Sequence, residues 1–227
     1  MDEQRKSWNK RQKKLRTVLL GTDPTSDAIE LFFEQHAAPH SSRMSGEGGW
    51  SFEDQILDNL GENGYRCIPS NYQHSIAWLV WHITRIEDVA IGMLVGGSSQ
   101  RFDEGDWSKR LGVKYFHTGN AMSADEIKDL SSTIHLDSLR AYRVEVGRRT
   151  RSIVKQLDLE ELSKSVDPKR LQIVSDLGIV VEAAQGVIEY WGKRTIAGLL
   201  LMPATRHNLI HLNEAAKIKS RLNRNEG

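Results

Sequence analysis

The apolar residues between Tyr72 and Val95 repeat at helical spacing, and no other stretch of the chain shows so strong a pattern. Side chains three and four positions apart lie on one side of an α-helix, so this pattern predicts a long helix with a buried face. Gly96 and Gly97 then end it. No run alternates with a period of two between hairpin turns, as a half-buried strand would. The sequence therefore predicts an all-α fold. The apolar positions are Ile76, Leu79, Val80, Ile83, Ile86, Ala90, Met93 and Leu94.

Helical periodicity continues along the rest of the chain. Pro203 lies inside the last predicted helix and should kink or restart it, because proline removes one backbone donor. Residues 96–122 are expected to form an irregular connection that could cover a site as a lid. Principal helices joined by long connections predict a four-helix bundle with accessory helices. The further helices are expected over residues 4–20, from Ser26 to His36, over 138–157 and 167–191, and from Thr195 onward.

A chain of 227 residues can bury one sizeable core, and nothing in its sequence requires a second domain. Residues 1–227 are therefore expected to form a single domain. Within it, residues 1–22 are a basic N-terminal helical extension that ends before a turn at Asp23 and Pro24. Its lysines and arginines are expected to form a solvated helix face, and contact with an anionic surface is the alternative.

The overall charge and the single cysteine exclude several classes of protein. The formal net charge is +1 and the sequence pI is about 7.9, so the chain lacks the basic excess of a nucleic-acid-binding protein. Cys67 is the only cysteine, so no intramolecular disulfide can form, and a reducing cytoplasmic location is expected. The apolar run from Ile196 to Pro203 is too short to span a bilayer, and no membrane association is expected.

Two histidines near the C-terminus, His207 and His211, are four residues apart in the last predicted helix. Four residues turn a helix by about 400°, so both rings point within roughly 40° of one direction, about 6 Å apart along the axis. An i, i+4 pair also arises by accident in a chain with eight histidines. Here the pair lies on the same stripe as Leu200, Ala204, Ala215, Ile218 and Leu222, and is therefore expected to face the bundle interior.

His82 is placed in the same way in the long central helix, on the side that carries Trp78 and Ile86. Three imidazoles can bind one divalent transition ion and leave a coordination position open for water or substrate. The sequence thus suggests a metal site formed by His82, His207 and His211. His36 and His40 form a second i, i+4 pair, but Pro39 disrupts the helix between them, so a second metal site is not expected there.

Two stretches carry a resemblance to a known family. Residues 75–83 with Glu87, and residues 206–212, resemble the DinB-like (YfiT-like) superfamily of helical-bundle proteins, and the likeness extends over most of the chain after residue 26. The resemblance implies that His82, His207 and His211 bind a divalent metal such as nickel, zinc or iron. It also implies a homodimer and, from members of known activity, thiol-dependent transfer chemistry. Relatives often place a Gly-Gln pair after the last histidine, whereas Leu212 and Asn213 stand here.

Glu214 lies about 20° from His207 and about 60° from His211 on the helix, so it is the candidate catalytic residue, as a general base or as a partner of a ligand. A surface salt bridge with Lys217 or Arg221 is the alternative. The function expected is that of a metal-dependent enzyme that acts on a small-molecule substrate by nucleophilic transfer, with a low-molecular-weight thiol as cosubstrate, or by hydrolysis. The alternative is a non-catalytic, metal-stabilised binding or stress-response module.

Overall fold

The computed structural model describes residues 2–21, 26–46 and 48–225. The turn expected at Asp23 and Pro24 lies outside these residues. Within them the chain is helical and contains no strand; the only bridge of strand type joins Ser165 and Thr195. This confirms the all-α class. A search of the helices in the described ranges finds none long and apolar enough to cross a membrane.

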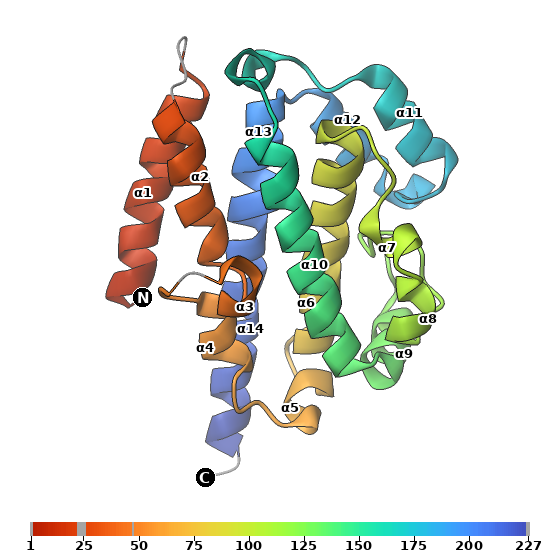
Figure 1. Cartoon of the computed structure of the whole chain (residues 1–227). Coiled ribbons are helices and arrows are strands. Elements are labelled where there is room, and N and C mark those ends of the chain that lie inside the picture. The colour runs from red at the N-terminus through yellow and green to blue at the C-terminus, as the bar shows by residue number, and fades with distance from the viewer. Residues whose placement is uncertain (1, 22–25, 47, 226–227) are drawn as a thin grey trace.

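Four long segments run side by side and enclose the core (Figure 1). They are α2 (Ser26–Ala37), α6 (Ile76–Glu87), α10 (Leu136–Lys155) and α14 (His207–Asn225). Helix α6 packs against both α10 and α14, while α2 packs against α10 and against the segment that precedes α14. Every residue of α6 is buried, because it has neighbours all round. The arrangement places α6 and α14 in contact, so histidines on these two helices can meet.

The basic N-terminal helix α1 (Glu3–Leu19) forms an additional layer on α2. Trp8 and Leu15 on its inner face are completely buried. The Trp8 indole donates a hydrogen bond to the Gln35 carbonyl, and the Gln35 side chain donates one back to the Trp8 carbonyl, at 3.0 Å each. This helix is therefore part of the core packing, and only its outer face is solvated as expected.

The long central helix changes character at its end. Beyond Glu87 it continues as a π-helix, η1 (Asp88–Val95), and all of its residues are buried. The Asp88 carboxylate accepts hydrogen bonds from the backbone of Arg101 and Phe102 and from the Tyr142 hydroxyl, at 2.7, 2.9 and 2.6 Å. Asp88 thereby accepts hydrogen bonds from the first backbone N–H groups of a short helix, α7 (Arg101–Glu104), which have no partner within that helix.

The interruption predicted at Pro203 is confirmed. The last helical segment is divided into α13 (Ile196–Leu201), a π-helical turn η4 (Met202–Arg206) and α14. Thr195 caps α13, because its hydroxyl accepts a hydrogen bond from the Gly198 backbone. The restart after Pro203 sets the rotation at which α14 presents its first residue, His207.

The connections contain more helix than expected in one place and less in another. The stretch expected to be irregular, 96–122, includes α7 and α8 (Trp107–Leu111), and the helix expected over 167–191 is interrupted between α11 (Pro168–Asp176) and α12 (Gly186–Gly192). Ser123 and Glu126 form a capping box at the start of α9 (Ala124–Thr133). The remaining elements are α3 (Ser42–Ser45), α4 (Phe52–Leu57), α5 (Glu62–Arg66), η2 (Leu159–Ser163) and η3 (Glu182–Ala184).

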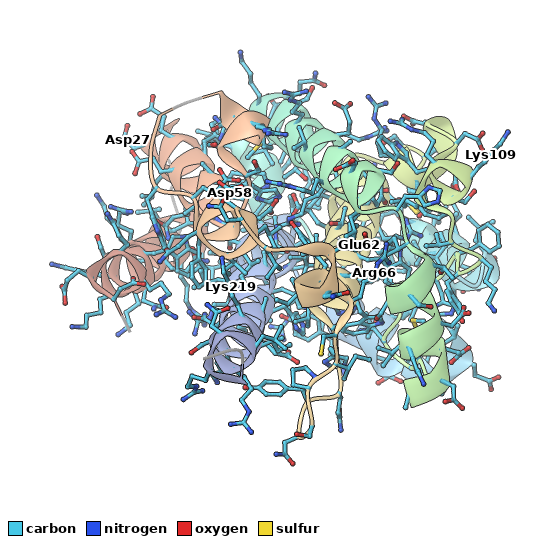
Figure 2. The ribbon with its side chains drawn as sticks, turned by 90° about the horizontal axis from the view of Figure 1, so that it is seen from below. Asp27, Asp58, Glu62, Arg66, Lys109 and Lys219 are labelled. Atoms are coloured by element: carbon cyan, nitrogen blue, oxygen red, sulfur yellow. The ribbon has the colours of Figure 1, made fainter. Side chains whose placement is uncertain are left out.

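Cationic side chains bind the ends of short helices at one end of the bundle, which Figure 2 shows from below. Lys219 of α14 donates to the carbonyls of Gln55, Ile56 and Asp58 at the end of α4, at 2.7–3.3 Å. Arg66, which also pairs with Glu62 at 2.9 Å, donates to carbonyls at the end of α9. Positive charge at a helix C-terminus satisfies carbonyls that have no partner within the helix.

Candidate metal centre

His82, His207 and His211 converge in the structure as predicted. His82 projects from the middle of α6, and the other two project from the first two turns of α14. One ligand atom from each ring lies within 4.8 Å of the others. The ring centroids are 5.2 Å apart for His82 with each partner and 4.6 Å apart for His207 and His211. This donor set fits a transition ion, because imidazole nitrogen is its commonest protein ligand.

The connection between α8 and α9 fixes the orientation of His82. The Nδ1 atom of its ring donates to the Thr118 carbonyl at 2.6 Å, so the neutral ring presents the lone pair of Nε2 to the other histidines. Thr118 comes close because Gly119 follows it: at φ +84°, a Cβ there would lie 2.6 Å from the Trp81 ring. Sequence reasoning expected a lid in this connection but gave no sign of this hydrogen bond.

Burial favours the neutral, metal-binding form of His82 and His207. Burial, and then the neighbouring His211, lower the pKa of His82 to about 3. For His207, burial followed by the proximity of His82 and His211 holds the pKa well below its ordinary value. His82 is 3% exposed, whereas His207 and His211 are partly exposed. The centre is thus anchored in the core on the α6 side and accessible on the α14 side.

Glu214 lies beside the histidine group, bound to a residue that the sequence did not single out. Its two carboxylate oxygens lie 2.8 Å from Nδ1 of His74 and 3.4 Å from Nδ1 of His211. Burial raises the pKa of Glu214, but hydrogen bonds from His211 and His74 outweigh burial and lower this pKa to about 2. The carboxylate is therefore charged at neutral pH, and it orients the His211 ring. Its catalytic role stays a prediction.

Aromatic stacking connects this centre to a surface pocket. The His74 ring stacks on Trp78 at 4.0 Å, and Trp78 stacks on His82 at 4.8 Å, with both interplanar angles at 8°. His74 and Trp78 also line an open pocket of 780 Å³, together with Tyr72, Met122 and Lys128. A larger pocket of 1190 Å³ lies near Lys219, at the end of the bundle shown in Figure 2. The three histidines line neither pocket, but only the first contains Trp78, whose ring stacks on that of His82. The first pocket is therefore the better candidate for substrate access.

Two arginines near the histidines along the chain, Arg85 and Arg206, have partners outside the histidine group. Arg85 is fully buried, donates to the Tyr142 hydroxyl at 3.1 Å and to the Phe116 carbonyl at 2.6 Å, and covers the Phe102 ring. It is neither solvated nor aimed at the histidine group. Arg206 is exposed and donates to the side chain of Asn9.

A second cluster of metal-binding side chains is present where none was expected. His36, at the end of α2, and His40, just beyond Pro39, lie against Glu87 of α6, and one ligand atom of each lies within 4.8 Å of the others. All three side chains are 0% exposed. The break at Pro39 keeps the two rings close instead of separating them: their centroids are 4.2 Å apart. Glu87 joins α6 to the end of α2 and is fully buried.

The family model that matches the chain is that of the DinB superfamily, over residues 53–215. The matched range contains α6, α10 and the three histidines, and it leaves out α1 and α2 with His36 and His40. Comparison with curated proteins finds no match. Since the model covers more than half of the residues, including all of α6 and the part of α14 that carries His207 and His211, the chain belongs to the DinB superfamily.

Proposed function

We propose that the protein is a metal-dependent enzyme that acts on a small molecule by nucleophilic transfer or hydrolysis. The convergence of His82, His207 and His211 carries this proposal. Three protein ligands leave at least one position of a divalent ion open, as in catalytic sites, whereas structural zinc sites are closed by four. Zinc, nickel and iron are all compatible with an imidazole donor set.

A divalent ion in this centre would supply Lewis acidity and lower the pKa of a coordinated water or thiol. The chain's own residues would prepare that chemistry. His82 would hold the ion through Nε2, since Nδ1 is bound to Thr118. Glu214 would orient His211 and raise its basicity through the hydrogen bond at Nδ1. Because its pKa is about 2, Glu214 suits this positioning role better than that of a general base at neutral pH.

A low-molecular-weight thiol is our proposed cosubstrate for the transfer reaction. Cys67, the only cysteine, is exposed and does not join the histidine group, so the protein offers no sulfur to the ion. A nucleophilic sulfur would have to come from a small molecule, and coordination would convert it to the thiolate. The pocket beside Trp78 and Met122 has apolar and polar walls that suit a small organic substrate.

Turnover measurements test this function. Protein purified without an affinity tag is assayed for metal content, for conjugation of small thiols to electrophiles and for hydrolysis of small esters and amides. We expect activity that a chelator removes and that His82→Ala abolishes. His135→Ala is the matched control, because the His135 side chain is exposed and hydrogen-bonds to the Arg110 carbonyl, away from the histidine group. Activity that is unchanged in the His82 variant would contradict the proposal.

A non-catalytic helical module that uses the ion for stability is the second candidate, favoured by the burial of His82 in the core. It predicts that metal raises the melting temperature while no turnover appears across the panel. The homodimer expected from the family resemblance is likewise a proposal, and small-angle scattering of the protein in solution tests it.

A further inference from the structure

The geometry at the second cluster points to a new metal site: we propose that His36, His40 and Glu87 together bind one divalent transition ion, separate from the three-histidine centre. Two imidazoles and one carboxylate are an N,N,O donor set that zinc, iron and manganese accept. The proposal does not depend on the activity proposed above.

The strongest support is an unpaired lone pair on His40. Its Nδ1 atom donates to the His36 carbonyl at 2.8 Å, so in the neutral ring Nε2 carries a lone pair and no hydrogen. Nε2 lies 3.1 Å from Oε2 of Glu87, yet the two atoms do not have the geometry of a hydrogen bond. Two acceptors facing each other at this distance in a dry interior repel, whereas a cation between them binds both.

The spacing of the donor atoms also fits an ion. Ligand atoms that each lie about 2.0–2.2 Å from a metal are roughly 3 Å apart from one another. In the cluster, Nε2 of His36 forms a hydrogen bond with Oε1 of Glu87 at 2.8 Å, and Nε2 of His40 lies 3.1 Å from Oε2. A bound ion would replace the proton of that hydrogen bond, because an imidazole binds metal in its deprotonated form. Coordination would therefore require only small shifts of these side chains.

The surroundings of Glu87 resemble those of a metal-binding carboxylate. Its oxygens accept hydrogen bonds from the Thr150 hydroxyl at 2.8 Å and from the Asn208 amide at 2.7 Å. Such donors orient a ligating carboxylate, and the carbonyl that holds Nδ1 of His40 does the same for an imidazole. His82 in the first centre is held by a backbone carbonyl in this same manner.

A missing side chain in α10 makes room for His40. A Cβ at Gly147 would lie 2.8 Å from Cδ2 of the His40 ring and 2.7 Å from Cγ of Met44. Glycine in the middle of a helix costs about 1 kcal/mol relative to alanine. The close approach of the His40 ring gives a reason for glycine at this position, and the ring is thereby held against Glu87.

Counting metal ions per chain tests the proposal. The full chain is produced without an affinity tag in zinc-supplemented medium, because a sealed site must take up its ion during folding. We expect about two zinc ions per wild-type chain and about one in the His82→Ala, His207→Ala, His211→Ala triple variant. His40→Gln should lose one ion and His135→Ala none. One ion in the wild type that the triple variant loses would leave only the first centre and overturn the proposal.

A second measurement avoids variants that fail to fold. Anomalous scattering at the zinc edge from crystals of the unmutated chain should give a peak about 2 Å from Nε2 of His40, in addition to any at the three-histidine centre. A peak at the three histidines without one beside His40 would show that a shared proton, not a metal, joins His40 to Glu87. No peak at His40 in crystals grown with excess zinc would also overturn the proposal.

Discussion

His82 and His40 are held alike, each by a backbone carbonyl on Nδ1, but they belong to centres with opposite surroundings. The His82 centre includes two partly exposed histidines and adjoins a pocket through Trp78. The His40 centre is closed to solvent on all sides and contains a carboxylate. Exposure therefore separates the two centres: the partly exposed one is where we propose the chemistry, and the sealed one is where we propose an ion that stabilises the fold.

The two centres share their helices. In α6, His82 faces one centre and Glu87, five residues later, faces the other. In α14, His207 belongs to the first, and the next residue, Asn208, donates to Glu87 in the second. The sealed centre thus ties α14 to α6 close to the point at which His207 leaves the helix. It also joins the region matched by the family model to α2, which lies outside the matched range.

The largest effect that separates the centres is expected from Glu87→Gln. Burial raises the pKa of Glu87, but the nearby His40 and His36 hold it well below its ordinary value, so the buried group is charged. Hydrogen bonds from His36, Thr150 and Asn208 stabilise this carboxylate in the absence of an ion. Removing one partner of a buried charged network costs about 3–5 kcal/mol. We therefore expect the free energy of unfolding to fall by about 3 kcal/mol in urea titrations with chelator present, so that the hydrogen bonds are measured without metal.

The difference in the free energy of unfolding between the wild type and Glu87→Gln should depend on pH. A carboxylate with a depressed folded-state pKa contributes stability above its unfolded pKa of about 4.3, and this stability is lost as the pH falls through the folded value. The wild type and Glu87→Gln should therefore converge in acid. Glu145→Gln is the control, because Glu145 makes only part-exposed ion pairs with Arg101 and Arg148. A loss below 1 kcal/mol for the Glu87 variant at neutral pH would mean that the sealed centre does not stabilise the fold.

A smaller effect, at the open centre, is expected from Glu214→Gln. Glu214 touches His211 from outside the ligand set, and loss of such a partner typically weakens metal binding by 10–100-fold. The carboxylate is partly exposed, so little change in the free energy of unfolding should accompany it. Isothermal titration with zinc measures the affinity. Unchanged affinity together with lost turnover would instead support the general-base role of Glu214.

The open centre could be predicted because its signals are local. The spacing of His207 and His211, the apolar stripe around them and the interruption at Pro203 are all properties of one helix, and the structure confirms each. His82 needed only the face of a second helix. The prediction missed the contacts between residues far apart in the sequence. These are the hydrogen bond from His82 to the Thr118 carbonyl and the one between His74 and Glu214.

The sealed centre was not predicted because its local signal was misleading. Helical spacing between His36 and His40 ends at Pro39, which argues against a shared ion as long as only the helix is considered. In the structure α2 ends at Ala37, and the turn that follows brings the His40 ring back to 4.2 Å from that of His36. No pattern in the sequence relates either histidine to Glu87, 51 and 47 residues later. Gly147 is the one residue whose type hints at a close approach.

Gly147→Ala therefore tests how tightly the sealed centre holds the His40 ring, and its expected main effect, expressed as a free energy, is the smallest of the three. Alanine in a helix interior normally stabilises by up to about 1 kcal/mol relative to glycine. At Gly147 the added Cβ would press on His40 and Met44, and overpacking of this kind costs about 1–3 kcal/mol, so a net loss of about 1 kcal/mol is expected. Gly186→Ala in α12 is the control, because nothing lies within 4 Å of its Cβ position, and it should be neutral or stabilising. Urea titration measures both variants. If Gly147→Ala were as stable as the control variant, the His40 ring would have room to move away from Glu87, and the fixed geometry on which the second metal site depends would be lost.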